Sequence, residues 1–379
     1  MLNGISMYPG LDNTIDENLA LLSKAAALGI RRIFTSLHIP ETNKGAFKDE
    51  LDQLLRAANR HHMEIISDIS PATLDMLNIK QFRLSAFRMM GIHTLRFDYG
   101  YGAPQIAKFS RNKQNIRIQL NASTISHKFL QELIDEKANF DHIDALHNFY
   151  PRPGTGISEN TLMRQTRMLH KAGIKVGAFI PSRNRRRAPL FEGLPTLETH
   201  RTMDPDLAAR HLAALGMDSV FIADSLPSDE ELMMLSRIRD DTVYVHAHAL
   251  TLEPVQRELL THVFTARIDE ARDAIRAQES RELVGGTIPP EPPRERQKAC
   301  ITLDNEKYHR YMGELQIIKR PQPPDERVNV VAQVNKEEQF LLDYIAPGHK
   351  LASMVIEQSK CVKCGACYQN CKFGAISIK

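Results

Sequence analysis

Short apolar runs alternate with helical patterns over the first 240 residues of the chain. Eight runs have the length and composition of buried strands, and roughly 25–45 residues separate one from the next. Between them, apolar residues recur at helical spacing, as over 18–28, which Gly29 ends, and over 47–60. The expected strands are residues 4–8, 32–37, 63–68, 94–98, 116–120, 143–146, 175–180 and 219–224.

This alternation is typical of a (β/α)8 TIM barrel, an α/β fold that needs about 250 residues. We therefore expect residues 1–240 to form a TIM-barrel catalytic domain. In such a barrel all strands run in parallel, so that their C-terminal ends meet at one face.

The pattern changes near residue 240. Residues 242–249 alternate apolar and polar, which predicts a strand, whereas residues 261–281 predict a charged helix. A loop rich in proline follows at 289–293, and further strands are expected over 301–305, 313–318, 328–334 and 339–344. These elements predict a small β-rich domain over 241–356 and a separate cysteine-rich tail over 357–379.

Composition narrows the classes of function. The formal net charge of +3 is small, so neither nucleic acid nor a membrane surface is implied as a partner. No apolar run approaches the ~20 residues that span a bilayer, and no secretory signal is visible at the start. The first 299 residues contain no cysteine, which does not fit a disulfide framework and indicates the cytoplasm.

Several apolar runs stop at a carboxylate. The third, fourth and eighth end at Asp68, Asp98 and Asp224, and Glu41 follows the second. Each of these alone could be a helix cap or a structural hydrogen-bond acceptor. Together they supply the two carboxyl groups that glycoside hydrolysis uses, one protonated and one ionised. Any two of the four can form the pair, and their separation decides between retention and inversion.

The loop over 147–153 combines imidazole, amide, phenol and guanidinium groups with two prolines. A solvated loop rarely needs this mixture, and proline stiffens the backbone, which suits the wall of a binding site. The alternative is a loop at the barrel rim whose polarity is accidental.

Four arginines, Arg183, Arg185, Arg186 and Arg187, follow the seventh strand. Barrels commonly bind phosphate in the loops after strands seven and eight, and arginine makes bidentate contacts with phosphate. We expect one or two of these arginines to bind phosphate and the others to lie on the solvated surface.

Other chemistries find less support in the sequence. His246 and His248 lie two apart on one strand face, the spacing of a metal-binding pair, but no third ligand is near. No lysine stands at a strand end, which weakens a Schiff-base aldolase interpretation. The chain also has no glycine-rich dinucleotide motif and no Walker loop.

The tail carries Cys361, Cys364, Cys367 and Cys371, in the spacing C-x2-C-x2-C-x3-C of bacterial iron–sulfur ligation. Lys372 stands where proline usually follows the fourth cysteine, and no second motif is present. Either Cys371 completes a single 4Fe-4S cluster locally or a partner supplies the remaining ligands. Zinc is the other metal that such soft ligands favour.

Long stretches of the chain resemble the 6-phospho-N-acetylmuramidases, bacterial cytoplasmic glycosidases of cell-wall sugar recycling. The similarity extends from residue 1 to about 356, and one departure is Arg187-Ala188-Pro189, where the family usually has Arg-Gly-Pro. The segments that carry it are residues 33–41, 95–100, 120–125, 147–152, 193–198, 304–305 and 311–316.

The resemblance implies a barrel followed by a cyclophilin-like β domain. It also implies hydrolysis of the disaccharide of 6-phospho-N-acetylmuramic acid and N-acetylglucosamine. We expect Asp68, Asp98, Asp224 and Glu41 to be catalytic, and Arg152 and Arg187, with Arg96 and Arg201 behind them, to bind the 6-phosphate. The expected substrate-binding residues are His38, Arg96, Asn121, His147, Asn148, Tyr150, Arg152, Arg187, Glu198 and Arg201.

The tail resembles the last half of a ferredoxin-type module, which implies a redox partner. Two classes of function therefore compete: a phosphoglycosidase with an appended cluster that hydrolysis does not need, and an iron–sulfur redox protein on a glycosidase scaffold. A carbohydrate-binding or structural protein is a third option, but it would not need carboxylates at three strand ends.

Overall fold

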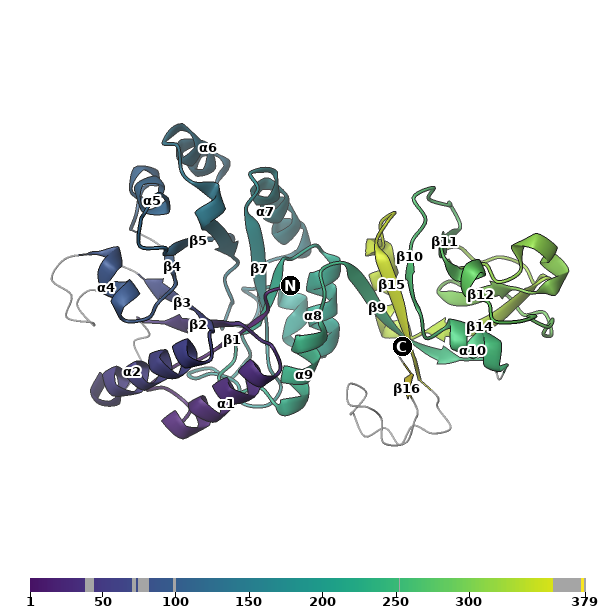
Figure 1. Cartoon of the computed structure of the whole chain (residues 1–379), viewed down its shortest axis with the longest axis horizontal. Helices are drawn as coiled ribbons and strands as arrows, with labels where there is room; N and C mark the ends of the chain where they lie inside the picture. Colours follow the sequence, from purple (N-terminus) through teal and green to yellow (C-terminus); the bar gives the residue numbers. More distant parts are fainter. Residues whose placement is uncertain are drawn as a thin grey trace. The chain divides into compact units, whose positions relative to one another are not determined.

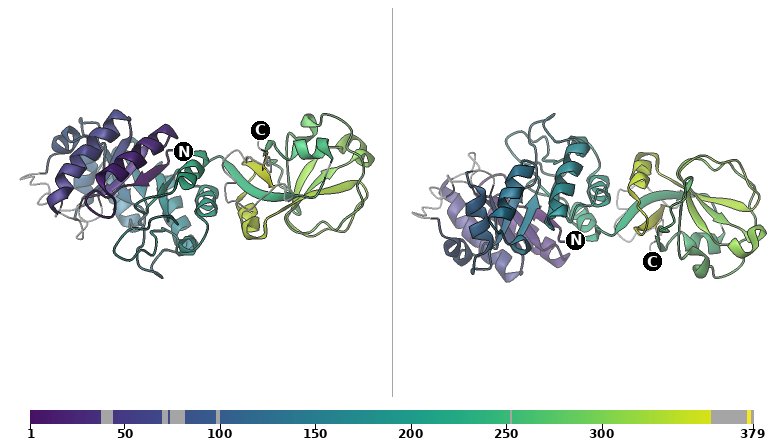
Figure 2. Two further views of the ribbon diagram at one scale, coloured as in Figure 1. Left: turned by 90° about the horizontal axis from the view of Figure 1, so that it is seen from below. Right: turned by 90° about the horizontal axis from the view of Figure 1, so that it is seen from above.

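The computed structural model describes residues 1–37, 44–69, 73, 82–97, 100–251, 253–356 and 376–377 (Figures 1 and 2). The chain divides into two compact units, Met1–Asp240 and Asp241–Lys379. Within the described part of the chain, no helix has the length and apolar character needed to cross a membrane.

The first unit is a closed barrel of eight parallel strands in sequence order, with β8 hydrogen-bonded back to β1 (Figure 1). All eight strands lie where the apolar runs predict them. They are β1 (Gly4–Ser6), β2 (Arg32–Ser36), β3 (Glu64–Ile69), β4 (Thr94–Phe97), β5 (Arg117–Asn121), β6 (Ile143–Leu146), β7 (Lys175–Ile180) and β8 (Ser219–Ile222).

Helices cover the outside of the barrel (Figures 1 and 2). Local signals fix their ends: Thr14 caps α1 with a capping box, and Gly29, at φ +80°, follows its last turn. The helices are α1 (Ile15–Ala27), α2 (Lys44–Arg60), α4 (Leu84–Met89), α5 (Ala103–Ser110), α6 (His127–Asp135), α7 (Glu159–Lys171), α8 (Pro205–Ala214) and α9 (Asp229–Arg237), with short 3-10 turns η1 (Phe140–His142) and η2 (Glu198–Arg201).

Aromatic side chains fill the middle of the barrel. Phe34 and Phe179 meet edge to face at 5.3 Å between ring centroids, and Phe221 packs against Phe179 at 5.6 Å. A Cβ atom on Gly4 would lie 2.2 Å from the Phe221 ring, so the glycine makes room for that ring. The barrel is therefore a packed core rather than a channel, and its polar groups lie toward the two ends.

At the N-terminal end, Arg32 of β2 lies buried between Glu64, at 3.0 Å, and Asp144, at 2.6 Å. Asp144 belongs to β6, so this ion pair crosses the barrel interior. Gln119 also donates to Asp144, at 3.0 Å. In barrels of this kind the N-terminal face contributes to stability rather than to chemistry.

The second unit is built on a mainly antiparallel sheet in the order β10-β15-β9-β14-β12-β13-β11, with β16 paired to β15. The structure thus confirms the expected class, a TIM barrel followed by a small β domain. Its elements are β9 (Thr242–Ala249), α10 (Pro254–Leu259), β10 (Val263–Thr265), β11 (Ala274–Arg276), η3 (Ser280–Leu283), β12 (Cys300–Asp304), η4 (Glu306–Tyr311), β13 (Leu315–Ile318), β14 (Val328–Val334), η5 (Lys336–Tyr344), β15 (Lys350–Ile356) and β16 (Ile376–Ser377).

The helix predicted over 261–281 is wrong. This segment forms β10 and β11, which pair antiparallel with β15 and β13. Its charged residues do not line a helix face but pair locally in the connecting loop, as Arg267 with Asp269 at 2.8 Å and Arg272 with Asp273 at 2.8 Å. The strand contacts of Phe264 and Ile275, both buried, outweigh the helical spacing.

The strand predicted over 339–344 is also wrong. These residues belong to the 3-10 helix η5, in which the adjacent Leu341 and Leu342 are both buried. A half-buried strand would bury alternate residues instead. The strand that follows η5 is β15, which pairs in parallel with β9. This strand was not among those predicted.

Candidate active site at the C-terminal end of the barrel

An ion pair lies inside the barrel at its C-terminal end. Asp68 of β3 and Arg96 of β4 are register partners, and Arg96 Nη1 lies 2.9 Å from Asp68 Oδ1. Arg96 Nη2 donates to Oδ1 of Asn148, which follows β6. β5 stands between β4 and β6, so this contact spans the C-terminal end of β5. Carboxylate, guanidinium and amide thus converge at one point.

Behind Asn148, a buried histidine shapes the wall of the site. His147 is fully buried and contacts Ser123 Oγ through Nδ1 at 3.1 Å and Thr166 Oγ1 through Nε2 at 3.2 Å. Burial, aided by the charge of Arg96, lowers the pKa of His147 to about 3, so the ring is neutral. Ser123 Oγ also accepts from the Asn148 amide at 2.9 Å. His147 therefore supports Asn148 from behind, without exposed surface for substrate.

Neighbouring loops are tied together around Asn148. Thr196 Oγ1 donates to the Asn148 carbonyl at 2.8 Å, and the Tyr150 amide donates to the Pro195 carbonyl at 2.9 Å. Asn121 ends β5 and accepts from the Ser123 amide at 3.1 Å. These bonds hold the ends of β5, β6 and β7 in one framework.

The loop after β7 places a buried arginine at the same face. The Arg187 guanidinium carbon lies 4.9 Å from the ring centroid of Tyr8 and 5.0 Å from that of Phe149. Only 9% of Arg187 is exposed, and its Nε donates to the Ala188 carbonyl at 3.2 Å. Tyr8 donates to the Ala223 carbonyl at 2.7 Å, and burial raises its pKa to about 12. The guanidinium is thus fixed between two neutral rings.

Asp224 differs from Asp68 in what it contacts. It is fully buried, and its oxygens accept from the Ser182 amide at 2.8 Å and the Arg187 amide at 3.0 Å. Burial raises the pKa of Asp224, and these amide bonds oppose the shift. The carboxylate therefore holds the loop that carries Arg187 and offers no exposed surface to a substrate.

Glu198 and Arg201 also form part of the framework. Arg201 Nε and Nη2 donate to the two Glu198 oxygens at 2.7 and 2.8 Å, and hydrogen bonds from Arg201 lower the pKa of Glu198 to about 2. Nη1 donates to the backbone carbonyls of Glu192 and Gly193, and Nη2 also donates to those of Tyr150 and Arg152. Every N–H of this guanidinium is engaged, so none is left for the expected contact with phosphate.

The other arginines of this face differ in what they contact. Arg183 pairs with Asp204 at 3.2 Å, and Arg185 pairs with Glu17 at 2.9 Å. Arg186 is half-buried and donates through Nε to the Ser182 carbonyl. Arg152 is exposed, and its guanidinium has no partner among the described residues.

Several of the expected residues belong to parts of the chain outside the described ranges. His38, Glu41 and Asp98 lie outside the described residues, as do Cys361, Cys364, Cys367 and Cys371. In the described part of the chain, no three His, Cys, Asp or Glu side chains are grouped so that they could hold a metal ion. His246, one of the two histidines considered for metal, instead contacts Glu338 at 2.6 Å.

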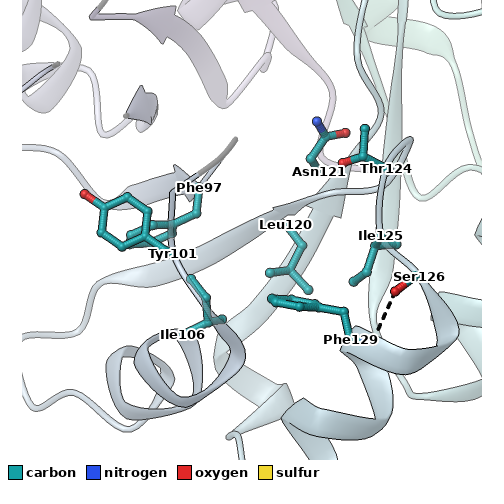
Figure 3. A pocket seen from close by; sticks show the side chains of 9 residues that line it. All are labelled: Phe97, Tyr101, Ile106, Leu120, Asn121, Thr124, Ile125, Ser126 and Phe129. Carbon is teal, nitrogen blue, oxygen red and sulfur yellow. Dashed lines mark hydrogen bonds between the residues drawn. The ribbon is translucent and has the colours of Figure 1, made fainter. Parts of the chain in front are cut away.

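A separate pocket of 240 Å³ lies on the outer side of β5, between α5 and α6 (Figure 3). Asn121 and Thr124 lie together at one end, whereas Ile106 and Phe129 lie in the apolar part. None of its lining residues is charged: Phe97, Tyr101, Ile106, Leu120, Asn121, Thr124, Ile125, Ser126 and Phe129. It is distinct from the cluster of charges around Asp68 and Arg187.

Sequence reasoning missed Tyr8 and Phe149 as parts of the site. Tyr8 ends the first apolar run, so the strand-end rule that selected Asp68 would also have selected it. Phe149 lies within the polar loop over 147–153, where its ring was overlooked among polar neighbours. No sequence signal shows that both rings stack on Arg187.

Family models match most of the chain. Residues 3–237 match the family model "6-phospho-N-acetylmuramidase, N-terminal", residues 245–352 match "6-phospho-N-acetylmuramidase, C-terminal", and residues 354–377 match "4Fe-4S binding domain". No curated protein matches the chain.

Two solved structures are similar over nearly the whole chain. An uncharacterized B. cereus protein shares 30% identity at a TM-score of 0.80, with 92% of this chain and 98% of that chain covered. A conserved Enterococcus faecalis protein of unknown function shares 32% identity at a TM-score of 0.69, with 95% and 97% covered.

Proposed function

The chain belongs to the 6-phospho-N-acetylmuramidase family and is a glycoside hydrolase, and from this premise we propose its substrate and the roles of its residues. The substrate is the disaccharide of 6-phospho-N-acetylmuramic acid and N-acetylglucosamine. The observation that carries the proposal is the convergence of Asp68, Arg96 and Asn148 at the barrel mouth, on the face that also holds Arg187.

Asp68 is the ionised member of the carboxyl pair. The adjacent Arg96 stabilises its charged form, as an opposite charge in contact does. It acts as base or nucleophile, while a protonated carboxyl group donates to the leaving oxygen. Glu41 and Asp98, which follow β2 and β4, are the candidates for this acid. Asp224 acts as a positioning residue through the Arg187 loop.

The 6-phosphate is bound by Arg187, with Arg152 as the exposed second cation. A guanidinium fixed by stacking keeps its donors oriented, which lowers the entropic cost of binding an anion. Arg186, in the same loop, is an additional candidate because no described residue pairs with its Nη atoms. Arg96 adds positive charge to the site, but its guanidinium is already paired with Asp68.

We place this reaction in the cytoplasm, as a step of cell-wall sugar recycling. The cysteine distribution supports this compartment, because thiols of the tail would be kept reduced there. The substrate carries charged groups that do not cross membranes unaided, so a cytoplasmic enzyme needs it delivered by uptake. The small net charge gives no reason to propose a nucleic acid or membrane partner.

Activity on the phosphorylated disaccharide, with the phosphate-free disaccharide as control, tests the proposal. Release of N-acetylglucosamine from the phosphorylated compound alone is the expected result. Equal release from both compounds would show that the enzyme does not recognise the phosphate. Release from neither would show that the proposed substrate is wrong.

The tail is proposed to bind one iron–sulfur cluster through Cys361, Cys364, Cys367 and Cys371. β15 and β16 flank this segment and pair antiparallel, Val355 with Ser377 and Ile356 with Ile376, which brings its two ends together. Because Ile356 and Ile376 are paired, we expect Cys371 to complete the ligand set within this chain. A bound cluster supplies one-electron transfer, for which a redox partner would be needed, whereas hydrolysis has no redox step.

Full-length protein purified without oxygen is therefore expected to contain about four irons per chain if a cubane forms. A chain ending at Glu357 should contain none and should keep its hydrolase activity, because the barrel holds the acid/base and phosphate groups. Iron analysis and kcat/KM on the phosphorylated disaccharide measure both.

The control changes all four tail cysteines to serine, which keeps β16 in the chain. Loss of activity in both the truncated and the serine forms, with native circular dichroism, would make the cluster part of the mechanism. Loss in the truncated form alone would assign the effect to the β15–β16 pairing.

A further inference from the structure

The loop between β7 and η2 presents two large apolar side chains to solvent at its tip. Leu190 is 47% exposed and Phe191 is 56% exposed. Phe191 is the one exposed aromatic side chain among the described residues of the barrel unit. An exposed apolar pair in the loop that carries Arg187 is a candidate contact surface for a ligand.

Phe191 also adopts an unfavourable backbone conformation. Its φ is +55°, in the left-handed region that bulky side chains rarely occupy. Residues persist there where the surrounding structure holds them, and such positions cluster at ligand-binding sites. A loop that only connected β7 to η2 would gain by placing glycine or asparagine at this position.

The loop is tied down on the N-terminal side of its tip. The Arg187 amide donates to Asp224 at 3.0 Å, and the Ala188 amide donates to the Asp12 carboxylate at 3.1 Å. The Phe191 amide itself donates to the Arg187 carbonyl at 3.2 Å. The backbone that carries the ring is therefore linked directly to the buried arginine.

The loop is equally tied on the C-terminal side. Arg201 Nη1 donates to the carbonyls of Glu192 and Gly193, at 3.3 and 3.0 Å. Leu194 is then buried in the barrel core. Since both sides are fixed, the backbone that carries the Phe191 ring is held in place before any ligand arrives, which reduces the ordering cost of binding.

The positive charge of Arg187 indicates which half of the substrate is left to contact the Phe191 ring. On the proposed function, the anionic phosphosugar is held by Arg187, which is buried between Tyr8 and Phe149. The other half of the disaccharide, N-acetylglucosamine, is uncharged, so the buried guanidinium does not account for its binding. The pocket of Figure 3 lies at β5, whereas Phe191 shares a loop with Arg187.

We propose that Phe191 is an aromatic platform for the uncharged N-acetylglucosamine ring of the leaving group. One face of a pyranose ring exposes C–H groups, and an aromatic ring offers a large, rigid and weakly hydrated surface against it. This inference rests on the proposed function. It assigns to Phe191 the selection of a sugar as the leaving group.

The test compares the phosphorylated disaccharide with 6-phospho-N-acetylmuramyl fluoride, whose leaving group has no ring. Phe191→Gly removes the ring at a backbone angle that glycine adopts freely, so the loop keeps its shape. We expect KM for the disaccharide to rise about tenfold and kcat/KM for the fluoride to stay within about twofold. Phe191→Tyr should restore the disaccharide KM.

Leu190→Ala is the matched control, because Leu190 is exposed to a similar extent, 47% against 56%, but has no ring. It should leave both substrates unchanged. If wild-type protein cleaves neither substrate, the proposed function fails and the platform with it. If wild type cleaves both and Phe191→Gly alters both equally or neither, the platform alone is overturned. A change in oligomeric state in both variants, with an unchanged disaccharide KM, would assign the tip to contacts between copies.

Discussion

Replacing Asp68 with Asn is expected to lower kcat on the phosphorylated disaccharide by about 100-fold or more, close to 2.7 kcal/mol of transition-state stabilisation. Asn has nearly the same volume and can still accept from Arg96 Nη1, which contacts Asp68 at 2.9 Å. The change removes the charge that a base or nucleophile needs. Steady-state kinetics with a thermal melt of each protein measures the effect.

Asp144→Asn is the matched control for this change. Asp144 is also buried in the barrel and paired with an arginine, Arg32, at 2.6 Å, but it lies at the N-terminal end. This variant should lose stability and keep kcat. Full activity of Asp68→Asn would exclude Asp68 from the chemistry. Equal losses of kcat in both variants would indicate that each acts through the fold.

The barrel could be predicted because its buried strands have a clear pattern of apolar residues in the sequence. A parallel strand that is covered on both faces reads as a nearly continuous apolar run, as in β7, whose bounds equal the predicted 175–180. The second unit was harder to predict. Its short strands β10 and β11 are only partly buried, so the charges around them produced a misleading helical pattern.

The location of the site residues could be predicted from the sequence, but their contacts could not. Strand-end position brought Asp68 and Asp224 to the same face, but sequence does not record what each side chain contacts. Asp224 accepts from two backbone amides, whereas Asp68 meets Arg96 at the mouth. Arg201 likewise lies at the expected face, but its N–H groups donate to backbone carbonyls and to Glu198. Such contacts depend on loop conformations that no local pattern encodes.

Arg187→Ala is expected to lower kcat/KM for the phosphorylated disaccharide by about 10- to 100-fold. A charge-assisted contact between arginine and phosphate contributes roughly 1.5–3 kcal/mol, which corresponds to this range. Activity on a phosphate-free substrate, where wild type shows any, should be unchanged. Arg187→Lys should recover little, because a lysine ammonium does not reproduce a planar guanidinium stacked between Tyr8 and Phe149.

Arg183→Ala provides the control within the same loop. Arg183 is exposed and paired with Asp204 at 3.2 Å, so removing it takes away a positive charge without opening the site. Inorganic phosphate supplies a second measurement: it should inhibit wild type and Arg183→Ala competitively and inhibit Arg187→Ala more weakly. Equal losses on phosphorylated and phosphate-free substrates would show that Arg187 supports the fold of the site through its stacking. A selective loss with weakened phosphate inhibition requires the guanidinium itself to contact the anion, since Asp224 and Asp12 still hold the loop in the variant.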